Sequence, residues 1–189
     1  AGATQDVEVS YGVSDGTATA SASVKFTVTG TNDAPTVSAV VTGSATEGGS
    51  PVTVNALANA SDVDVGGVAL TVVGVQDPLP AGVTYDAAKH EFAFDPTDAA
   101  YNSLSAGVKQ DVVVSYGVSD GTATTSTSVK FTVTGTNDAP TVSAVVTGSA
   151  TEDGSSVKVN ALLNASDVDV SDTLTVVNVP GTLPAGVTY

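Results

Sequence analysis

The sequence predicts an all-β chain of tandem immunoglobulin-like β-sandwich modules, each about 105 residues long. The first observation is an internal repeat: residues 5–65 align with residues 110–170 at a constant offset of 105, and 54 of these 61 residues are identical. A repeat of this length fits one small autonomous domain rather than a solenoid unit. The second observation is a succession of short segments rich in Val and Thr, separated by Gly, Pro, Asp and Asn. The third is the lack of any stretch with convincing helical periodicity.

The repeat also fixes where modules meet. The sequence LPAGVTY at 79–85 recurs at 183–189, where the offset has become 104. Short extended linkers with a proline at the end lie at 30–35 and 135–140, and proline biases the residue before it away from helix. We therefore expect three parts: the C-terminal part of one module at 1–33, a complete module at 34–138, and the N-terminal part of a third at 139–189.

Each module is expected to contain about seven strands. The segments 112–118 and 124–134 predict a hairpin around the turn Ser-Asp-Gly-Thr at 119–122, and residues 7–29 are its earlier copy. A short helical turn is expected at 95–101, capped by Asp95. Further strands are expected at 36–41, 51–55, 70–75, 83–85 and 91–94. The aromatic residues of these strands are expected in the core: Tyr11, Tyr116, Phe92, Phe94 and Phe131.

The charge is strongly acidic, with five Lys, no Arg and twenty acids, for a net charge of −15. A chain of this charge lacks the basic face that nucleic acids and anionic membrane surfaces require. Its 41% hydrophobic content argues against disorder. No run approaches the eighteen apolar residues of a membrane span, so no membrane insertion is expected. The composition favours a folded protein whose carboxylates bind cations, although solubility alone would also explain a net acidic charge.

Cysteine is absent and there is a single histidine, His90. Neither a zinc site nor a nucleophilic triad can be built from this set. A pair of carboxylates could in principle hydrolyse a glycoside, but the sequence does not distinguish such a pair from metal ligands. We expect no enzymatic activity. Metal sites often replace disulfides as staples in small extracellular domains.

The linker sequence NDAP at 32–35 resembles the NDNAP linker of cadherin repeats. Glu47 lies where cadherins have an acid on an early strand, Asp62-Val63-Asp64 resembles the cadherin DxD motif, and VSDG at 118–121 resembles AxDxG. The cadherin LDRE motif is missing, although Asp95 and Asp98 occupy its region. The whole chain resembles more closely the VCBS-type and cadherin-like repeats of giant bacterial RTX adhesins, in segments such as VSYGVSDGTAT and FTVTGTNDAP.

This resemblance implies Ca²⁺ sites at the junctions between modules. Calcium takes six to eight oxygen ligands, which several segments meeting at one pole of a sandwich can provide. The first junction is expected to use Asn32, Asp33, Glu47, Asp62, Asp64 and Asp120. The second is expected to use Asn137, Asp138, Glu152, Asp167 and Asp169, with Asp95 or Asp98 from the preceding module. Two further acids, Asp153 and Asp172, stand where the earlier copy has Gly48 and Gly67.

Simpler interpretations remain open for most of these residues. Asp120 fits an ordinary turn at a hairpin tip, and Asp62 with Asp64 fits a solvated turn. Glu47 and Glu152 also have an interpretation in which they bind no metal. Asp95 and Asp98 fit helix caps nearly as well as metal ligands.

The function that follows is a calcium-rigidified extender, or spacer, repeat of a large secreted bacterial cell-surface adhesin that mediates cell adhesion or biofilm formation. The alternatives are an adhesive module that binds a glycan or a protein itself, and an accessory region of a secreted enzyme. The expected partners are neighbouring modules of the same chain, and neighbouring chains where terminal modules are open. Protease-sensitive ends around a stable core would fit a longer continuous array, and filaments would fit completion by another chain.

Overall fold

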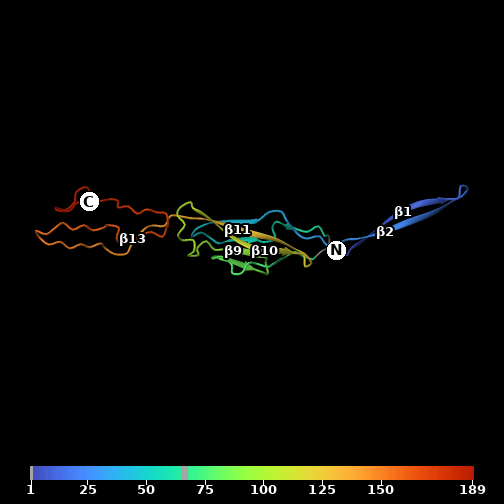
Figure 1. Cartoon of the computed structure of the whole chain (residues 1–189), viewed down its shortest axis with the longest axis horizontal. Helices are drawn as coiled ribbons and strands as arrows, with labels where there is room; N and C mark the ends of the chain where they lie inside the picture. Colours follow the sequence, from blue (N-terminus) through green and yellow to red (C-terminus); the bar gives the residue numbers. More distant parts are fainter. Residues whose placement is uncertain (1, 65–67) are drawn as a thin grey trace.

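The computed structural model describes residues 2–64 and 68–189. These residues form an elongated arrangement: a hairpin projects from one end, a sandwich occupies the middle, and residues from 139 onward extend from the other end (Figure 1). The described part of the chain contains strands and turns and no helix, as the sequence predicts.

The described residues form thirteen strands. The N-terminal hairpin consists of β1 (Thr4–Ser14) and β2 (Thr19–Thr29). Beyond the second linker lie only β12 (Thr141–Val142) and β13 (Ala165–Ser166). The middle of the chain contains β3 (Thr36–Val37), β4 (Val41–Thr46), β5 (Val52–Asn55), β6 (Ala60–Ser61), β7 (Thr71–Val73), β8 (Val83–Asp86), β9 (Glu91–Phe94), β10 (Lys109–Ser119) and β11 (Thr124–Thr134).

The central sandwich has two main sheets. One has the order β4-β11-β10-β7, and the other has the order β5-β9-β8. Their inner faces meet through aromatic rings. Phe94 of β9 stacks on Phe131 of β11 with 5.3 Å between the ring centroids, and Phe92 packs on Tyr116 with the same centroid distance. Gly43 of β4 is needed beside this core, since a Cβ there would lie 2.6 Å from Phe131 Cδ1. This is the predicted β-sandwich.

The long hairpin is the best predicted element. Strand β11 has the predicted bounds, and β10 begins three residues earlier than predicted, at Lys109. Val129, Phe131 and Val133 of β11 are buried and the residues between them are only half-buried, so one face of this part of the strand lies in the core. The predicted strand at 36–41 is instead the two-residue β3 followed by β4. The short strand β6 and the parallel pairing of β4 with β11 were not foreseen.

The predicted helical turn at 95–101 is wrong. This segment is a run of non-helical turns, closed by Asp98 N donating to Asp95 O and Tyr101 N donating to Asp98 O. Local side-chain hydrogen bonds from Asp and Thr compete with helix formation, and they win here.

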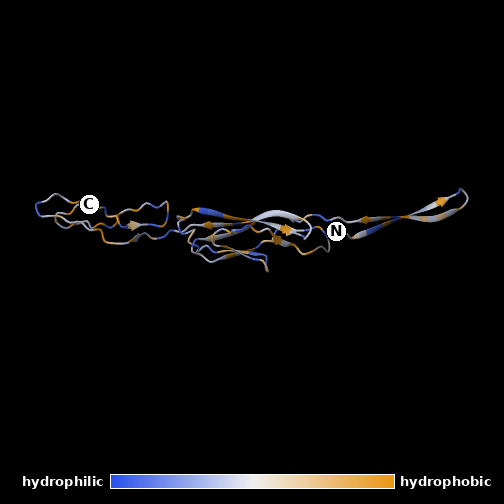
Figure 2. Cartoon of the chain, turned by 60° about the horizontal axis from the view of Figure 1, so that its bottom comes forward, coloured by the Kyte–Doolittle hydropathy of each residue, from blue (hydrophilic) through white to orange (hydrophobic). Residues whose placement is uncertain are grey.

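The hairpin β1–β2 repeats the sequence of β10–β11 but not its burial. Tyr11 is 50% exposed and Phe26 is 58% exposed, whereas their equivalents Tyr116 and Phe131 are buried. The expectation of a core position is therefore wrong for Tyr11 and confirmed for the other four aromatic residues. Figure 2 shows apolar positions along this projecting hairpin, where the described structure places no second sheet.

Candidate junction sites

At the first linker, three separate segments meet. The side-chain amide of Asn32 donates to Asp120 Oδ2 at 2.8 Å, and the backbone N–H of Asp33 donates to Asp64 Oδ2 at 3.0 Å. The tip of the hairpin is tied down further by Thr125 Oγ1, which donates to the carbonyl of Pro35 at the end of the linker. The linker, the DxD loop and the hairpin tip therefore come together, as expected.

Asp62 shapes the DxD loop. Its Oδ1 accepts the backbone N–H of Asp64 at 2.8 Å, which closes a local turn. Its Oδ2 is buried and has no hydrogen-bond partner in the structure. A buried carboxylate oxygen without a partner is unfavourable, because desolvation is then not compensated. A bound cation would compensate it.

Asp120 is 7% exposed and serves both the turn and the junction. Its Oδ1 accepts the backbone N–H groups of Thr122 and Ala123, and its Oδ2 accepts from Asn32. The Ala123 N–H, then the Asn32 amide, then the Thr122 N–H hold the pKa of Asp120 below its ordinary value. Asp120 is therefore charged at neutral pH and fixed in place at the linker.

The second linker repeats the arrangement of the first. The backbone N–H of Asp138 donates to Asp169 Oδ2 at 2.8 Å, and Asp167 Oδ1 accepts the backbone N–H of Asp169 at 3.0 Å. Asn137 donates to the carbonyl of Asp138, as Asn32 does to Asp33. Asp169 is only 3% exposed, and its Oδ1 has no hydrogen-bond partner. Each DxD loop therefore carries one buried carboxylate oxygen without a partner.

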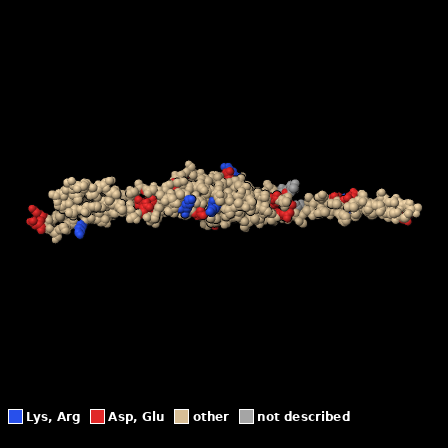
Figure 3. Space-filling view, turned by 90° about the horizontal axis from the view of Figure 1, so that it is seen from above, with Lys and Arg blue, Asp and Glu red and all other residues tan. Residues whose placement is uncertain are grey.

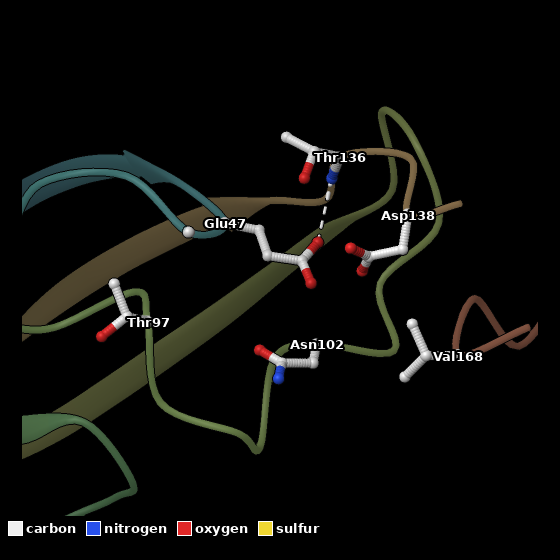
Figure 4. A pocket seen from close by; sticks show the side chains of 7 residues that line it. Glu47, Thr97, Asn102, Thr136, Asp138 and Val168 are labelled. Atoms are coloured by element: carbon white, nitrogen blue, oxygen red, sulfur yellow. Dashed lines mark hydrogen bonds between the residues drawn. The ribbon is translucent and has the colours of Figure 1, made fainter. Parts of the chain in front are cut away.

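Glu47 lies at the second junction, which corrects its predicted place at the first. Its Oε2 accepts the backbone N–H of Thr136 at 2.9 Å, and Glu47 lines an open cleft of about 240 Å³ together with Asp138 (Figure 4). The cause is the direction of β4, which runs parallel to β11 from Val41 to Thr46. The end of β4 therefore reaches the pole at which β11 enters the second linker.

Glu152 is the repeat equivalent of Glu47, and its assignment to the second junction is corrected in the same way. A turn with the same hydrogen bond follows both residues, from Gly49 N to Thr46 O and from Gly154 N to Thr151 O. Glu152 is exposed, and the segment around it lies at the end of residues 139–189 that is remote from the second linker (Figure 1). The acid at the second junction comes from the preceding sandwich.

Asp95 and Asp98 belong to the loop beside the second junction, but their carboxylates cap turns. Asp95 Oδ1 accepts both the N–H and the hydroxyl of Thr97, and these bonds lower the pKa of Asp95, the hydroxyl most. Asp98 Oδ1 accepts the N–H of Ala100. The loop reaches the cleft through Thr97, which lines it, and through Pro96, whose carbonyl accepts the N–H of Gly48.

Four lining residues of the cleft were not foreseen from the sequence. Asn102 offers an amide oxygen, and Thr97 and Thr136 offer hydroxyls, whereas Val168 provides an apolar wall. Thr97 and Asn102 belong to no recognisable motif, and their place beside the cleft depends on the fold of the 95–105 segment, which periodicity does not reveal. Thr136 and Val168 lie within the linker and DxD motifs but are not the residues that those motifs mark as ligands.

The donors at both junctions are carboxylate, amide, hydroxyl and backbone oxygens, which is the set that calcium prefers. Acidic side chains gather at both ends of the central sandwich (Figure 3). Within residues 2–64 and 68–189, no group of three or more His, Cys, Asp or Glu side chains is arranged to hold a metal ion. The residues fit a calcium site by their chemistry and by their two unpartnered buried oxygens. Two residues noted above, Val65 and Gly67, lie outside the described part of the chain.

The described residues include no helix that is long and apolar enough to cross a membrane.

Several solved structures resemble the fold. Protocadherin gamma B2 extracellular domains 1–5 match with a TM-score of 0.44 and 13% identity, over 75% of this chain and 28% of that one. The protocadherin gamma B4 extracellular domain matches with a TM-score of 0.44 and 19% identity, over 74% of this chain and 23% of that one. An endo-fucoidan hydrolase of glycoside hydrolase family 107 matches with a TM-score of 0.37 and 16% identity, over 69% of this chain and 19% of that one. This chain thus spans less than a third of each of these three structures.

No curated protein matches the chain. Residues 31–134 match the sequence profile of the cadherin-like domain family, which describes an adhesion-type extracellular module. This match covers the two-sheet sandwich from the first linker to the end of β11. The chain belongs to the cadherin-like domain family.

Proposed function

We propose that this chain is a calcium-rigidified extender of a large secreted bacterial surface adhesin, in which calcium at the linkers fixes each sandwich relative to the next. The surface adhesin would use such repeats in cell adhesion or biofilm formation, and neighbouring repeats of the same chain would be their main partners. The chain would have no catalytic role in this proposal.

The observation that carries the proposal is a feature that both DxD loops share, although the unpartnered oxygen belongs to Asp62 in the first loop and to Asp169, rather than to its repeat equivalent Asp167, in the second. In each loop one aspartate holds the linker, through Asp64 with Asp33 and through Asp169 with Asp138. In each loop one buried carboxylate oxygen has no hydrogen-bond partner. A cation bound at these oxygens would join a linker to the loop that follows it.

The position of the acids supports a mechanical role. The buried apolar core residues lie between Val41 and Val133 in the central sandwich, and none of them belongs to a linker. Calcium would therefore act on the orientation of the sandwich more than on its folding. Calcium that binds only the native state at one hundred times its dissociation constant still adds about 2.7 kcal/mol to stability. That is a large part of a typical domain stability of about 5–15 kcal/mol.

Calorimetric titration of the chain with calcium chloride tests this proposal. We expect Asp138→Asn with Asp169→Asn to weaken calcium binding, because both substitutions keep an oxygen donor and remove a charge at the second linker. The matched control is Asp86→Asn, at an exposed aspartate that forms a salt bridge with Lys89 and hydrogen bonds within its own turn rather than with a linker. Equal ion number and affinity in the double variant and in the control would contradict the proposal.

A further inference from the structure

The second junction contains a direct contact that uses no acidic side chain. The backbone N–H of Val170 donates to the carbonyl of Ser103 at 3.4 Å. The N–H of Ser171 donates to Ser105 Oγ at 3.3 Å, and the Ser171 hydroxyl donates to the same oxygen at 2.5 Å. These three hydrogen bonds join the central sandwich to the second DxD loop. We call them the serine clasp.

The sandwich side of the clasp is firmly anchored. Ser105 is 7% exposed, and its carbonyl accepts the N–H of Val108. The turn is packed against the start of the linker, because a Cβ on Gly135 would lie 2.1 Å from the Leu104 carbonyl oxygen. A hydrogen bond from Gly107 N to Gly135 O holds the two segments together. Ser105 therefore moves with the sandwich.

The opposite side of the clasp belongs to the second DxD loop. Ser171 follows Asp169 by two residues, and Asp169 Oδ2 accepts the N–H of Asp138 in the linker. A turn from Asp172 N to Asp169 O closes the loop just after Ser171. The loop is thus held at two points, by the linker and by the Ser103–Ser105 turn. Both attachments are hydrogen bonds between protein groups.

The first junction differs from the second at this position. At the constant offset of the repeat, the equivalent of Ser171 is Gly66, in the otherwise matching sequences DVDVG and DVDVS. Gly66 lies outside the described residues, but glycine has no hydroxyl in any conformation. The Ser–Ser hydrogen bond of the clasp therefore has no equivalent donor in the first DxD loop.

We infer that the serine clasp keeps the second junction oriented without calcium, whereas the first junction hinges when calcium is removed. This inference rests on the proposed function for the role of calcium at the first junction. One net hydrogen bond favours a given orientation by about fivefold, and three act together here. The repeats then carry two kinds of joint, one without the serine clasp and one with it.

Distance measurements between pairs of nitroxide labels test the inference. The chain has no cysteine, so introduced cysteines give specific labelling. Labels at the exposed positions Ser23 and Thr53 span the first junction, and labels at Thr53 and the exposed Ser156 span the second. Each pair is measured in calcium and in EGTA. The variant Ser171→Gly places the first-junction residue in the second junction, and Ser171→Ala removes the hydroxyl alone.

The control variant is Ser103→Ala, which keeps the backbone carbonyl that the clasp uses. In EGTA we expect the distances across the second junction to stay narrowly distributed in the parent and in Ser103→Ala. We expect the narrow distribution to be lost in both Ser171 variants, at an unchanged melting temperature because Ser171 is exposed. A parent distribution that broadens across both junctions alike, or Ser171 variants that match the parent, would overturn the clasp.

The same data separate the two proposals. If the distances across the first junction are equal in calcium and in EGTA, calcium rigidification fails at that junction. The clasp is then still decided by the comparison of Ser171→Ala with the parent across the second junction.

Discussion

Glu47 Oε2 and the backbone nitrogen of Thr136 are 2.9 Å apart, although 89 residues separate them in the sequence. This hydrogen bond joins the end of an early strand to the linker that leaves the sandwich. It places a carboxylate from one module beside Asp138 of the linker, which is the neighbour that a shared cation site requires.

Glu47→Gln is the first test of this relationship. The amide oxygen can still accept the Thr136 N–H, but the charge beside Asp138 is lost. We expect calcium affinity at the second junction to fall about tenfold, or ~1.4 kcal/mol, with the first junction unaffected. Calorimetry measures both. The matched control is Glu152→Gln, at the same position of the next repeat. Weakening by the control and not by Glu47→Gln would show that the original sequence-based assignment was right.

Asp62→Asn together with Asp64→Asn tests the first junction. Asn at position 62 can still accept the N–H of residue 64, so the local turn is expected to persist. Two negative charges are removed, and calcium affinity at the first junction should fall by more than tenfold, as for loops with fewer charged ligands. Circular dichroism should show a folded sandwich. An unchanged ion count and affinity would make both residues ordinary turn residues.

Phe131→Ala tests the core. Phe131 is fully buried and stacks on Phe94, so its truncation should lower the free energy of unfolding by about 3–5 kcal/mol. Phe26→Ala removes the equivalent side chain from β2, where it is 58% exposed, and should cost far less. Urea denaturation followed by tyrosine fluorescence measures the difference. Equal losses would mean that Phe26 is buried in solution.

The pKa of Asp120 gives a pH prediction. Its folded-state pKa lies below the ordinary value of 3.8, because backbone N–H groups and Asn32 stabilise the carboxylate. The carboxylate therefore stabilises the fold above that pH, and the stabilisation is lost as the pH falls through the lower folded-state value. Denaturation in EGTA at a series of pH values should show a smaller acid-induced loss for Asp120→Asn than for the parent. If the stability of Asp120→Asn and of the parent depended on pH in the same way, Asp120 would make no pH-dependent contribution to stability.

The sequence was most informative where pairing is local. The hairpin β10–β11 could be predicted because segments rich in Val, Thr, Ser and aromatic residues lie on both sides of an Asp-Gly turn. The meeting of Asp33 with the DxD loop and of Asn32 with the hairpin tip at Asp120 could be predicted from the linker motif. The Asp95–Tyr101 turns were missed because capping side chains look the same at a helix start and in isolated turns.

The order of residues along the chain could not show which of the two junctions contains Glu47. Its sequence position follows the first linker, but β4 pairs in parallel with β11 and carries it to the opposite pole. Parallel pairing between distant segments leaves no local signal. The serine clasp was missed for a similar reason, since Ser105 and Ser171 are ordinary residues until the fold brings them together.

Small-angle X-ray scattering of the chain in calcium and in EGTA tests the central claim most directly. If calcium fixes the junctions, the radius of gyration and the maximum dimension should both decrease in EGTA, because a hinged chain samples bent arrangements. Magnesium at equal ionic strength serves as the control, since it fits such oxygen cages less well. Identical radius of gyration and maximum dimension in calcium and in EGTA would contradict calcium rigidification.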